Sequence, residues 1–381
     1  MTYAITGANG FLGSALVAEL LRGGKSVRAL VRRPEAAAEL NALAGETPAP
    51  PLREQVRTEA TSDAPSSGRP PSEHGASLEI HRGDLTDARS LRGFVRDGDI
   101  VIHCAARVDM SGRWRDFERV NIGGTENVLA AALAVRPRRF VYISSGAVYG
   151  TIDPGGVCAD RTPAEPLRYN LYGRSKLAGE QCVQAGCQRA GVPWTVLRLG
   201  FIYGAGNRAL LQHVEPLLRK GKMILLGSGE NRIATLEISD AAAAVLLAAT
   251  RTTAAGRVYD VASDEAVTQR HFFEATADAL GLPHPTRTIR PAAAWWIARV
   301  AELLARMVGR SAPLTRAMVD LMSADQLVDA GAIRSELGWS PRVDFDTGMR
   351  RMRAWCTGRR IIAGLNLETP PVENRCHSKP A

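Results

Sequence analysis

Tyr172 and Lys176 are the two residues in this sequence whose types and spacing best suit proton transfer. Positions i and i+4 share one face of a helix, so a helix here would bring the two side chains together. A free phenol has a pKa of about 10 and is a poor base at neutral pH, whereas a nearby ammonium group lowers that pKa. Ser145 ends the apolar segment 140–145 and could donate a hydrogen bond to a substrate oxygen. These three residues form the predicted catalytic group.

A glycine motif near the N-terminus, TGANGFLG at 6–13, predicts a second functional element. The motif follows the short apolar strand predicted at 3–6 and opens a segment, 10–21, with leucines at helical spacing. A strand, a glycine turn and a helix in this order are typical of dinucleotide-binding folds. Beside the tyrosine–lysine pair, this motif predicts a nicotinamide cofactor and hydride transfer.

Each glycine of the motif has an expected role. Gly7 would permit the tight turn, Gly10 would let the backbone approach a pyrophosphate, and Gly13 would let the helix pack closely on the strand. The N–H groups at the helix N-terminus would bind the anion.

The residues after the second predicted strand, 27–31, bear on which dinucleotide is bound. NAD-binding folds tend to have a carboxylate there, whereas this chain has Arg32 and Arg33. A guanidinium group suits the 2′-phosphate of NADP, so we expect NADP to be preferred over NAD, unless both arginines point to solvent. Asp84 follows the third strand and could accept a hydrogen bond from adenine, whereas Asp87 could equally be a helix cap.

The order of predicted elements indicates an α/β fold. Buried strands are expected at 100–106 and 140–145, with a helix between them at about 121–134. Such alternation predicts a doubly wound parallel Rossmann sheet.

The predicted organisation has two domains. We expect a Rossmann domain at 1–200 and a smaller, mostly helical substrate-binding domain at 201–357, interleaved with the Rossmann core. Residues 44–77, rich in proline and polar residues, are predicted to be a disordered insertion. The polar residues 358–381 are predicted to be a flexible tail.

Composition narrows the class of protein. The 381 residues are 45% apolar and 23% charged, as in soluble globular proteins. The net charge of +9 comes largely from arginine, but no nucleic-acid-binding signature accompanies it. The six cysteines are scattered without a CxxC pair, so neither a metal site nor a disulfide framework is expected. The start of the chain lacks the pattern of a secretory signal. We therefore expect a cytoplasmic protein, with no nucleic-acid partner.

With these motifs, residues 2–356 outside the insertion resemble the extended short-chain dehydrogenase/reductase superfamily. The matching segments are TGANGFLG (6–13), GDLTD (83–87), HCAA (103–106), VNIGGTENVL (120–129), SSGAVYG (144–150) and YGRSK (172–176). The resemblance implies a Rossmann domain with Ser145, Tyr172 and Lys176 as the catalytic trio. It also implies that Asn121 lies near the nicotinamide. Further positions expected to contact the cofactor are Asn9, Phe11, Leu12, Leu85, Ala105, Ala106, Ser144 and Leu199.

The segment RLGFIYG (198–204) is similar to the RPxxIYG segment of 3β-hydroxysteroid dehydrogenase-like proteins, with Leu199 in place of proline. Nucleotide-sugar epimerases typically have an asparagine where this chain has Phe201. This branch implies redox chemistry on a secondary alcohol or ketone of a hydrophobic substrate, such as a steroid, terpenoid or lipid. Two alternatives stay open: a nucleotide-sugar epimerase or dehydratase, and a non-catalytic NADP-binding sensor.

The segment 292–309 is amphipathic, with large apolar residues at helical spacing and Arg299, Glu302 and Arg306 opposite them. It could pack its apolar face on the core, or it could lie at a membrane surface near the substrate entrance, as the resemblance implies for some members. The superfamily also implies a homodimer.

Overall fold

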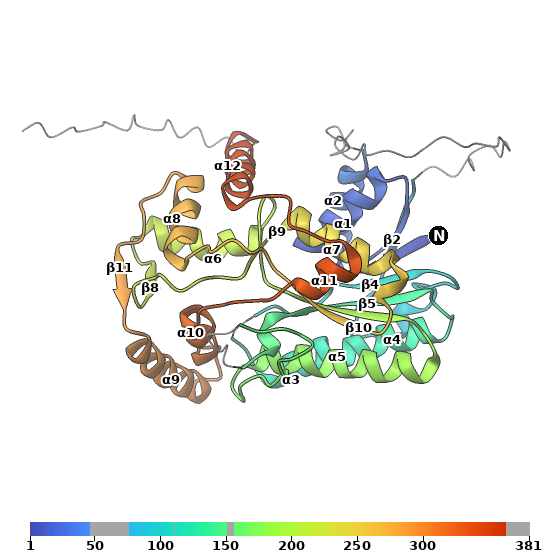
Figure 1. Cartoon of the computed structure of the whole chain (residues 1–381), viewed down its shortest axis with the longest axis horizontal. Helices are drawn as coiled ribbons and strands as arrows, with labels where there is room; N and C mark the ends of the chain where they lie inside the picture. The colour runs from blue at the N-terminus through green and yellow to red at the C-terminus, as the bar shows by residue number, and fades with distance from the viewer. Residues whose placement is uncertain (46–75, 110, 151–155, 363–381) are drawn as a thin grey trace, which may run out of the picture.

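The computed structural model describes residues 1–45, 76–109, 111–150 and 156–362. A layered α/β part lies at one end of the molecule and a smaller part, built mainly of helices, at the other (Figure 1). The chain passes between them directly after strand β6 (Trp194–Leu199), because β7 (Phe201–Tyr203) belongs to the smaller part. The smaller part therefore lies at the carboxyl edge of the sheet, where ligands of doubly wound folds bind.

Seven parallel strands form the central sheet in the order β10-β6-β5-β4-β1-β2-β3. Along the sheet the strand numbers fall to β1 and then rise again, which is the strand order of a doubly wound fold. The predicted doubly wound Rossmann sheet is confirmed. Besides β6, the strands are β1 (Thr2–Thr6), β2 (Ser26–Val31), β3 (Leu78–Arg82), β4 (Ile100–His103), β5 (Arg139–Ser145) and β10 (Arg257–Val261).

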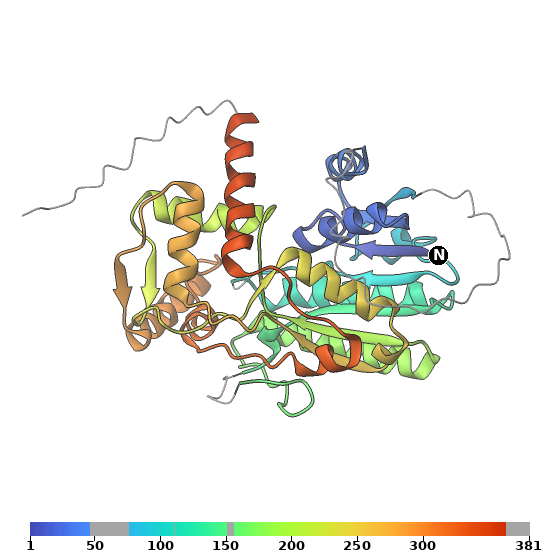
Figure 2. The same cartoon turned by 45° about the horizontal axis from the view of Figure 1, so that its top comes forward.

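Helices cover both faces of this sheet (Figures 1 and 2). One face packs on α1 (Phe11–Arg22), α2 (Pro34–Gly45) and α7 (Ile238–Thr250). The other packs on α4 (Gly124–Leu133) and α5 (Leu171–Ala190). The leucine spacing in α1 has the expected effect, since Leu12, Leu16 and Leu20 are all buried.

The C-terminal half also contributes to the sheet part, through β10 and α7. The rest of this half contains a separate apolar core, which is built largely from α6 (Arg208–Arg219), α8 (Gln269–Leu280) and α12 (Phe345–Ile362). The remaining elements of this part are β8 (Ile224–Leu226), β9 (Thr235–Glu237), β11 (Arg287–Ile289), α9 (Pro291–Met307) and α10 (Arg316–Ser323). Helix α11 (Gly331–Leu337) packs instead on the sheet part beside β10, where Ile333 and Leu337 are buried.

Four local expectations differ from the structure. Strand β4 ends at His103 rather than residue 106, because the backbone of Ala105 turns to donate a hydrogen bond to Thr6 on β1. The helix expected from residue 121 begins as a π-helix at Glu118–Gly123. Helix α2 was not expected, and the predicted tail begins inside α12. The insertion at 44–77 and the tail mostly lie outside the described residues.

Candidate active site

The glycine loop between β1 and α1 has no room for side chains at two of its three glycines. Gly7 has a positive φ of 66°, and a Cβ there would lie 2.8 Å from the backbone nitrogen of Ala105. A Cβ at Gly13 would lie 2.8 Å from the Cα of Ala8 and still closer to the carbonyl oxygen of Gly7. Gly10 forms the N-cap of α1, and no side chain among the described residues caps the helix there. The loop thus presents free N–H groups and fits a pyrophosphate.

A buried chain of hydrogen bonds ties this loop to β4 and the π-helix. The hydroxyl of Thr6 lies 2.6 Å from Nδ1 of His103, and Nε2 of His103 lies 3.0 Å from the hydroxyl of Thr125. Thr125 donates in turn to the carbonyl oxygen of Asn121, at 2.6 Å. Burial lowers the pKa of His103 to about 3, so the imidazole is neutral at neutral pH. His103 therefore has a positioning role, which the sequence did not indicate.

The amide side chain of Asn121 fixes the loop after β4. It accepts a hydrogen bond from the backbone N–H of Arg107 at 2.7 Å and donates one to the carbonyl oxygen of Arg107 at 3.1 Å. It also donates to the hydroxyl of Ser175 on α5, at 2.9 Å. Because Asn121 lies on a π-helix, a feature frequent at functional sites, it reaches both the loop and the tyrosine–lysine helix.

Tyr172 lies in the first turn of α5, close to Ser145 at the end of β5. Asn170 caps the helix by accepting a hydrogen bond from Gly173 N–H at 2.9 Å, which fixes the start of α5. Burial raises the pKa of Tyr172 to about 12, and a hydrogen bond with Ser145 acts in the opposite direction. The structure therefore places the serine and tyrosine together, with the phenol protonated at neutral pH.

Lys176 follows one turn later and is almost fully buried, with 3% of its surface exposed. Its ammonium nitrogen lies 4.2 Å from the ring centroid of Tyr142 on β5. Burial lowers the pKa of Lys176 to about 8, whereas the charges of Glu180 and Cys104 raise it. The sequence led us to expect that the lysine lowers the pKa of Tyr172. In the structure the group that lowers it is Ser145.

A buried ion pair lies beneath Lys176. Glu180, one turn further along α5, binds Arg198 of β6, with Nη2 and Oε2 2.8 Å apart and both side chains less than one-tenth exposed. Ser144 donates to the same carboxylate at 2.5 Å. Arg198 also donates to the hydroxyl of Tyr149 at 3.0 Å, and Tyr149 donates to Asp260 of β10 at 2.8 Å. The sequence analysis missed Glu180, although the i+4 spacing from Lys176 was a usable signal.

The residues expected to select the coenzyme lie at the ends of β2 and β3. Arg32 and Arg33 are exposed, and Nη1 of Arg32 lies 3.8 Å from Oδ2 of Asp84. The other oxygen of Asp84 accepts a hydrogen bond from the Thr86 N–H at 2.8 Å, and this bond is the largest effect lowering the carboxyl pKa. Asp87 caps the short helix that follows by accepting a hydrogen bond from the backbone N–H of Arg89, so the helix-cap role expected for this residue is present.

The remaining predicted cofactor positions differ in exposure. Asn9 is exposed, and Phe11, Leu85, Ala105 and Ala106 are partly buried. The side chains of Leu12, Ser144 and Leu199 are buried, so only the backbone of Leu12 and Leu199 could contact a ligand closely. Leu199 pairs in register with Ser145, which places it at the sheet edge beside the catalytic group.

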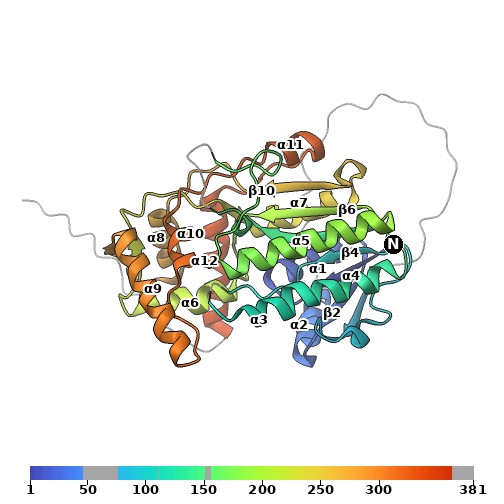
Figure 3. The ribbon, with the colours of Figure 1, turned by 90° about the horizontal axis from the view of Figure 1, so that it is seen from below.

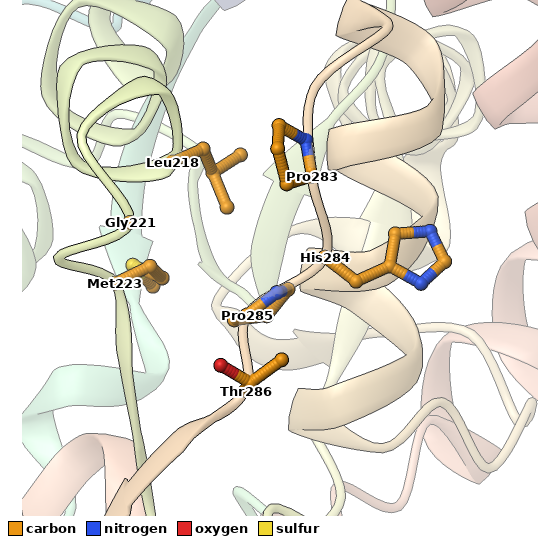
Figure 4. A pocket seen from close by; sticks show the side chains of 7 residues that line it. All are labelled: Leu218, Gly221, Met223, Pro283, His284, Pro285 and Thr286. Atoms are coloured by element: carbon orange, nitrogen blue, oxygen red, sulfur yellow. The ribbon is translucent and has the colours of Figure 1, made fainter.

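A small surface depression lies in the C-terminal part, lined by residues from 218–223 and 283–286. It is formed where α6 ends and the segment before β11 passes, with Leu218, Met223 and Pro285 on its wall (Figure 4). His284 points away from it and lies 2.8 Å from Asp278 on α8. None of the predicted site residues lines this depression, which is therefore not the candidate active site.

The described residues contain no group of three or more histidine, cysteine, aspartate or glutamate side chains able to hold a metal ion. No helix among them is long and apolar enough to cross a membrane.

Comparison with known proteins agrees with the geometry. A 2-alkyl-3-oxoalkanoate reductase of Stenotrophomonas maltophilia is 29% identical over 72% of this chain and 85% of its own length. A 3 beta-hydroxysteroid dehydrogenase/Delta 5-->4-isomerase of Mycobacterium tuberculosis is 28% identical over 88% of this chain and 85% of its own. These relatives confirm the predicted class, an oxidoreductase that resembles the 3β-hydroxysteroid dehydrogenases.

Solved structures agree on the fold. MoeE5 in complex with UDP-glucose and NAD superimposes with a TM-score of 0.65 at 24% identity, over 94% of this chain and 99% of that one. The NAD dependent epimerase/dehydratase family matches residues 3–262, which is more than half of the sequence. The chain therefore belongs to the NAD dependent epimerase/dehydratase family, within the extended short-chain dehydrogenase/reductases.

Proposed function

We propose that this protein is an NADP(H)-preferring oxidoreductase that interconverts a ketone and a secondary alcohol on a hydrophobic substrate. The observation that carries the proposal is the placement of Ser145, Tyr172 and Lys176 at the carboxyl edge of the sheet, beside a glycine loop that fits a pyrophosphate. All three side chains are at least partly buried, which favours a proton transfer shielded from water.

In the direction of reduction, Tyr172 donates its phenolic proton to the substrate oxygen. The phenol is protonated at neutral pH because burial raises its pKa to about 12. The hydroxyl of Ser145 donates a hydrogen bond to the same oxygen and orients it. Ser145 is also the group that lowers the pKa of the phenol, whereas Lys176, one turn further along α5, would hydrogen-bond the ribose of the bound coenzyme. A bound nicotinamide would supply the hydride.

Phe201 supports a hydrophobic substrate rather than a sugar nucleotide. It stands where nucleotide-sugar enzymes typically have an asparagine, and its ring lies 5.3 Å from that of Phe272, at a right angle. Its side chain is part of the apolar core of the C-terminal part and cannot donate a hydrogen bond to a diphosphate. The similarity to a reductase of alkylated oxoalkanoates and to a steroid dehydrogenase supports the same class.

Arg32 and Arg33 support the preference for NADP. Both lie at the carboxyl end of β2, where a ribose 2′-phosphate would lie, and Oδ2 of Asp84 is 3.8 Å from Nη1 of Arg32. A guanidinium group there would form charge-assisted hydrogen bonds with the phosphate oxygens.

The proposal is tested by following the absorbance of NADPH and NADH with long-chain β-keto acids and with steroid ketones. UDP-glucose would be assayed in parallel for epimerised product. Oxidation of NADPH by a hydrophobic ketone, faster than that of NADH, is the expected result. Conversion of UDP-glucose without net change of the coenzyme, and without turnover of any ketone, would replace the proposal with the epimerase alternative.

A further inference from the structure

Helix α9 carries its large apolar side chains on the outside. Its buried positions are all alanine: Ala294, Ala298 and Ala305. Seven larger apolar side chains on the helix and just beyond it are more than half exposed: Trp296, Ile297, Val300, Leu303, Leu304, Met307 and Val308. We call this surface the α9 face. The helix packs beside α10 at the outer rim of the C-terminal part (Figures 1 and 3). An apolar patch of this extent marks an interaction site.

The charges around the α9 face are positive. Arg299, Arg306 and Arg310 are exposed, and the guanidinium carbon of Arg299 lies 5.9 Å from the ring centroid of Trp296. Glu302, the one acidic residue in the sequence of the helix, turns inward. Its two carboxylate oxygens accept hydrogen bonds from the backbone N–H and from Nε of Arg316, at 2.8 and 2.9 Å.

We propose that the α9 face docks on the surface of an anionic lipid bilayer. A helix with an exposed apolar face, tryptophan among its apolar residues and arginine beside it is suited to lie in the plane of the interface. The arginines would meet lipid phosphates, and the apolar side chains would enter the boundary between headgroups and acyl chains. A second copy is a poorer partner, because a symmetric pairing of two α9 faces brings their arginine groups together.

The α9 face is joined to the catalytic helix by a cluster of aromatic rings and charges. The ring of Trp295 on α9 lies 6.5 Å from that of Tyr169, which precedes α5 and is three residues before Tyr172. The guanidinium carbon of Arg316 lies 4.3 Å from the Tyr169 ring and 5.3 Å from the Trp295 ring. The hydroxyl of Tyr169 donates to Asp320 on α10 at 2.5 Å. Docking through α9 would hold the start of α5 close to the lipid surface.

The docking of the α9 face does not depend on the proposed function. The experiment is sedimentation of the full chain with phosphatidylcholine vesicles that contain roughly one third phosphatidylserine, compared with vesicles of phosphatidylcholine alone. The wild type should bind the anionic vesicles, and its binding should weaken with added salt. The double substitution Leu303→Glu with Met307→Glu should reduce the partition coefficient at least roughly tenfold.

Two further variants separate the contributions of charge and apolar surface. Arg299→Gln with Arg306→Gln should weaken binding to anionic vesicles by roughly fivefold for each arginine, with little effect on neutral vesicles. The matched control is Leu217→Glu on α6, also an exposed apolar residue, which should bind like the wild type. Unchanged melting temperature and coenzyme binding would show that the variants are folded.

Two outcomes would overturn the proposal. One is equal sedimentation of the wild type and the double glutamate variant with anionic vesicles. The other is a wild-type dimer that does not bind vesicles and becomes monomeric in the double glutamate variant, which would assign the α9 face to a second copy. A failure of the proposed function is distinguishable, because it would abolish ketone turnover without changing vesicle binding.

Discussion

Helices α5 and α9 distribute their residues in opposite ways. Helix α5 buries Lys176 and Glu180, two charged residues that a soluble helix normally exposes. Helix α9 buries alanines and exposes large apolar residues that a soluble helix normally buries. In both helices the departure from ordinary amphipathic packing coincides with a predicted function. The comparison indicates that residues on the unexpected side of a helix are informative about ligands.

The largest effect is expected at Tyr172, on the buried face of α5. Substitution Tyr172→Phe removes the proton donor, so the turnover number for ketone reduction should fall by about 10³-fold or more, within the range for general acid catalysis. Coenzyme affinity should change little, because the ring remains. Turnover and coenzyme binding would be measured on the same preparation by NADPH absorbance and fluorescence. A variant with wild-type turnover would exclude Tyr172 as the proton donor.

Glu180 should show the next largest effect, because it neutralises a buried charge. Substitution Glu180→Gln leaves Arg198 without its carboxylate, and removal of one partner of a buried ion pair costs about 3–5 kcal/mol in the free energy of unfolding. Chemical denaturation would measure this loss. The control is Glu19→Gln, which breaks an exposed pair with Arg22 and should cost about 1 kcal/mol or less. Equal losses in the two variants would contradict a special role for the buried pair.

The same substitution should also alter the pH dependence of turnover. Burial lowers the pKa of Lys176 to about 8, and the charge of Glu180 acts in the opposite direction. If turnover requires the ammonium form, the rate of the wild type should fall as the pH rises through about 8. Without the Glu180 carboxylate the lysine loses its proton more easily, so the alkaline limb should move to lower pH. A limb that stays in place would restrict Glu180 to a structural role.

Exposed charges should behave differently from these buried ones. Substitution of Arg32 and Arg33 by alanine should leave the free energy of unfolding almost unchanged, because both side chains are solvated. The KM for NADPH should rise by roughly tenfold to a hundredfold, as expected for the loss of charge-assisted hydrogen bonds, whereas the KM for NADH should change little. Steady-state kinetics with each coenzyme would measure the two effects. An equal rise for both coenzymes would mean that the arginines do not contact a 2′-phosphate.

Sequence patterns predicted the parts of the molecule that local rules determine. The alternation of strands and helices in the sheet part before residue 200, apart from α2, and the glycine loop followed from apolar spacing and turn chemistry, and the structure agrees. Helical spacing could have indicated Glu180, but its pairing with Arg198 was beyond such rules, because it depends on β6 lying beside β5 and packing on α5. The sequence also could not show whether the apolar face of α9 is buried or exposed, since periodicity identifies an apolar face without showing what covers it.

The smallest effect is expected on the outside of α9, and it completes the comparison with α5. Leu303 is 59% exposed, so Leu303→Gln should change the free energy of unfolding by no more than about 0.5 kcal/mol. Ala298 on the inner face is fully buried, and Ala298→Leu should cost about 1–3 kcal/mol through overpacking. Thermal or chemical denaturation of both variants would test this. A loss of several kcal/mol at Leu303 with none at Ala298 would mean that α9 packs on the protein by its large apolar side, and the α9 face would then be unavailable to a lipid surface.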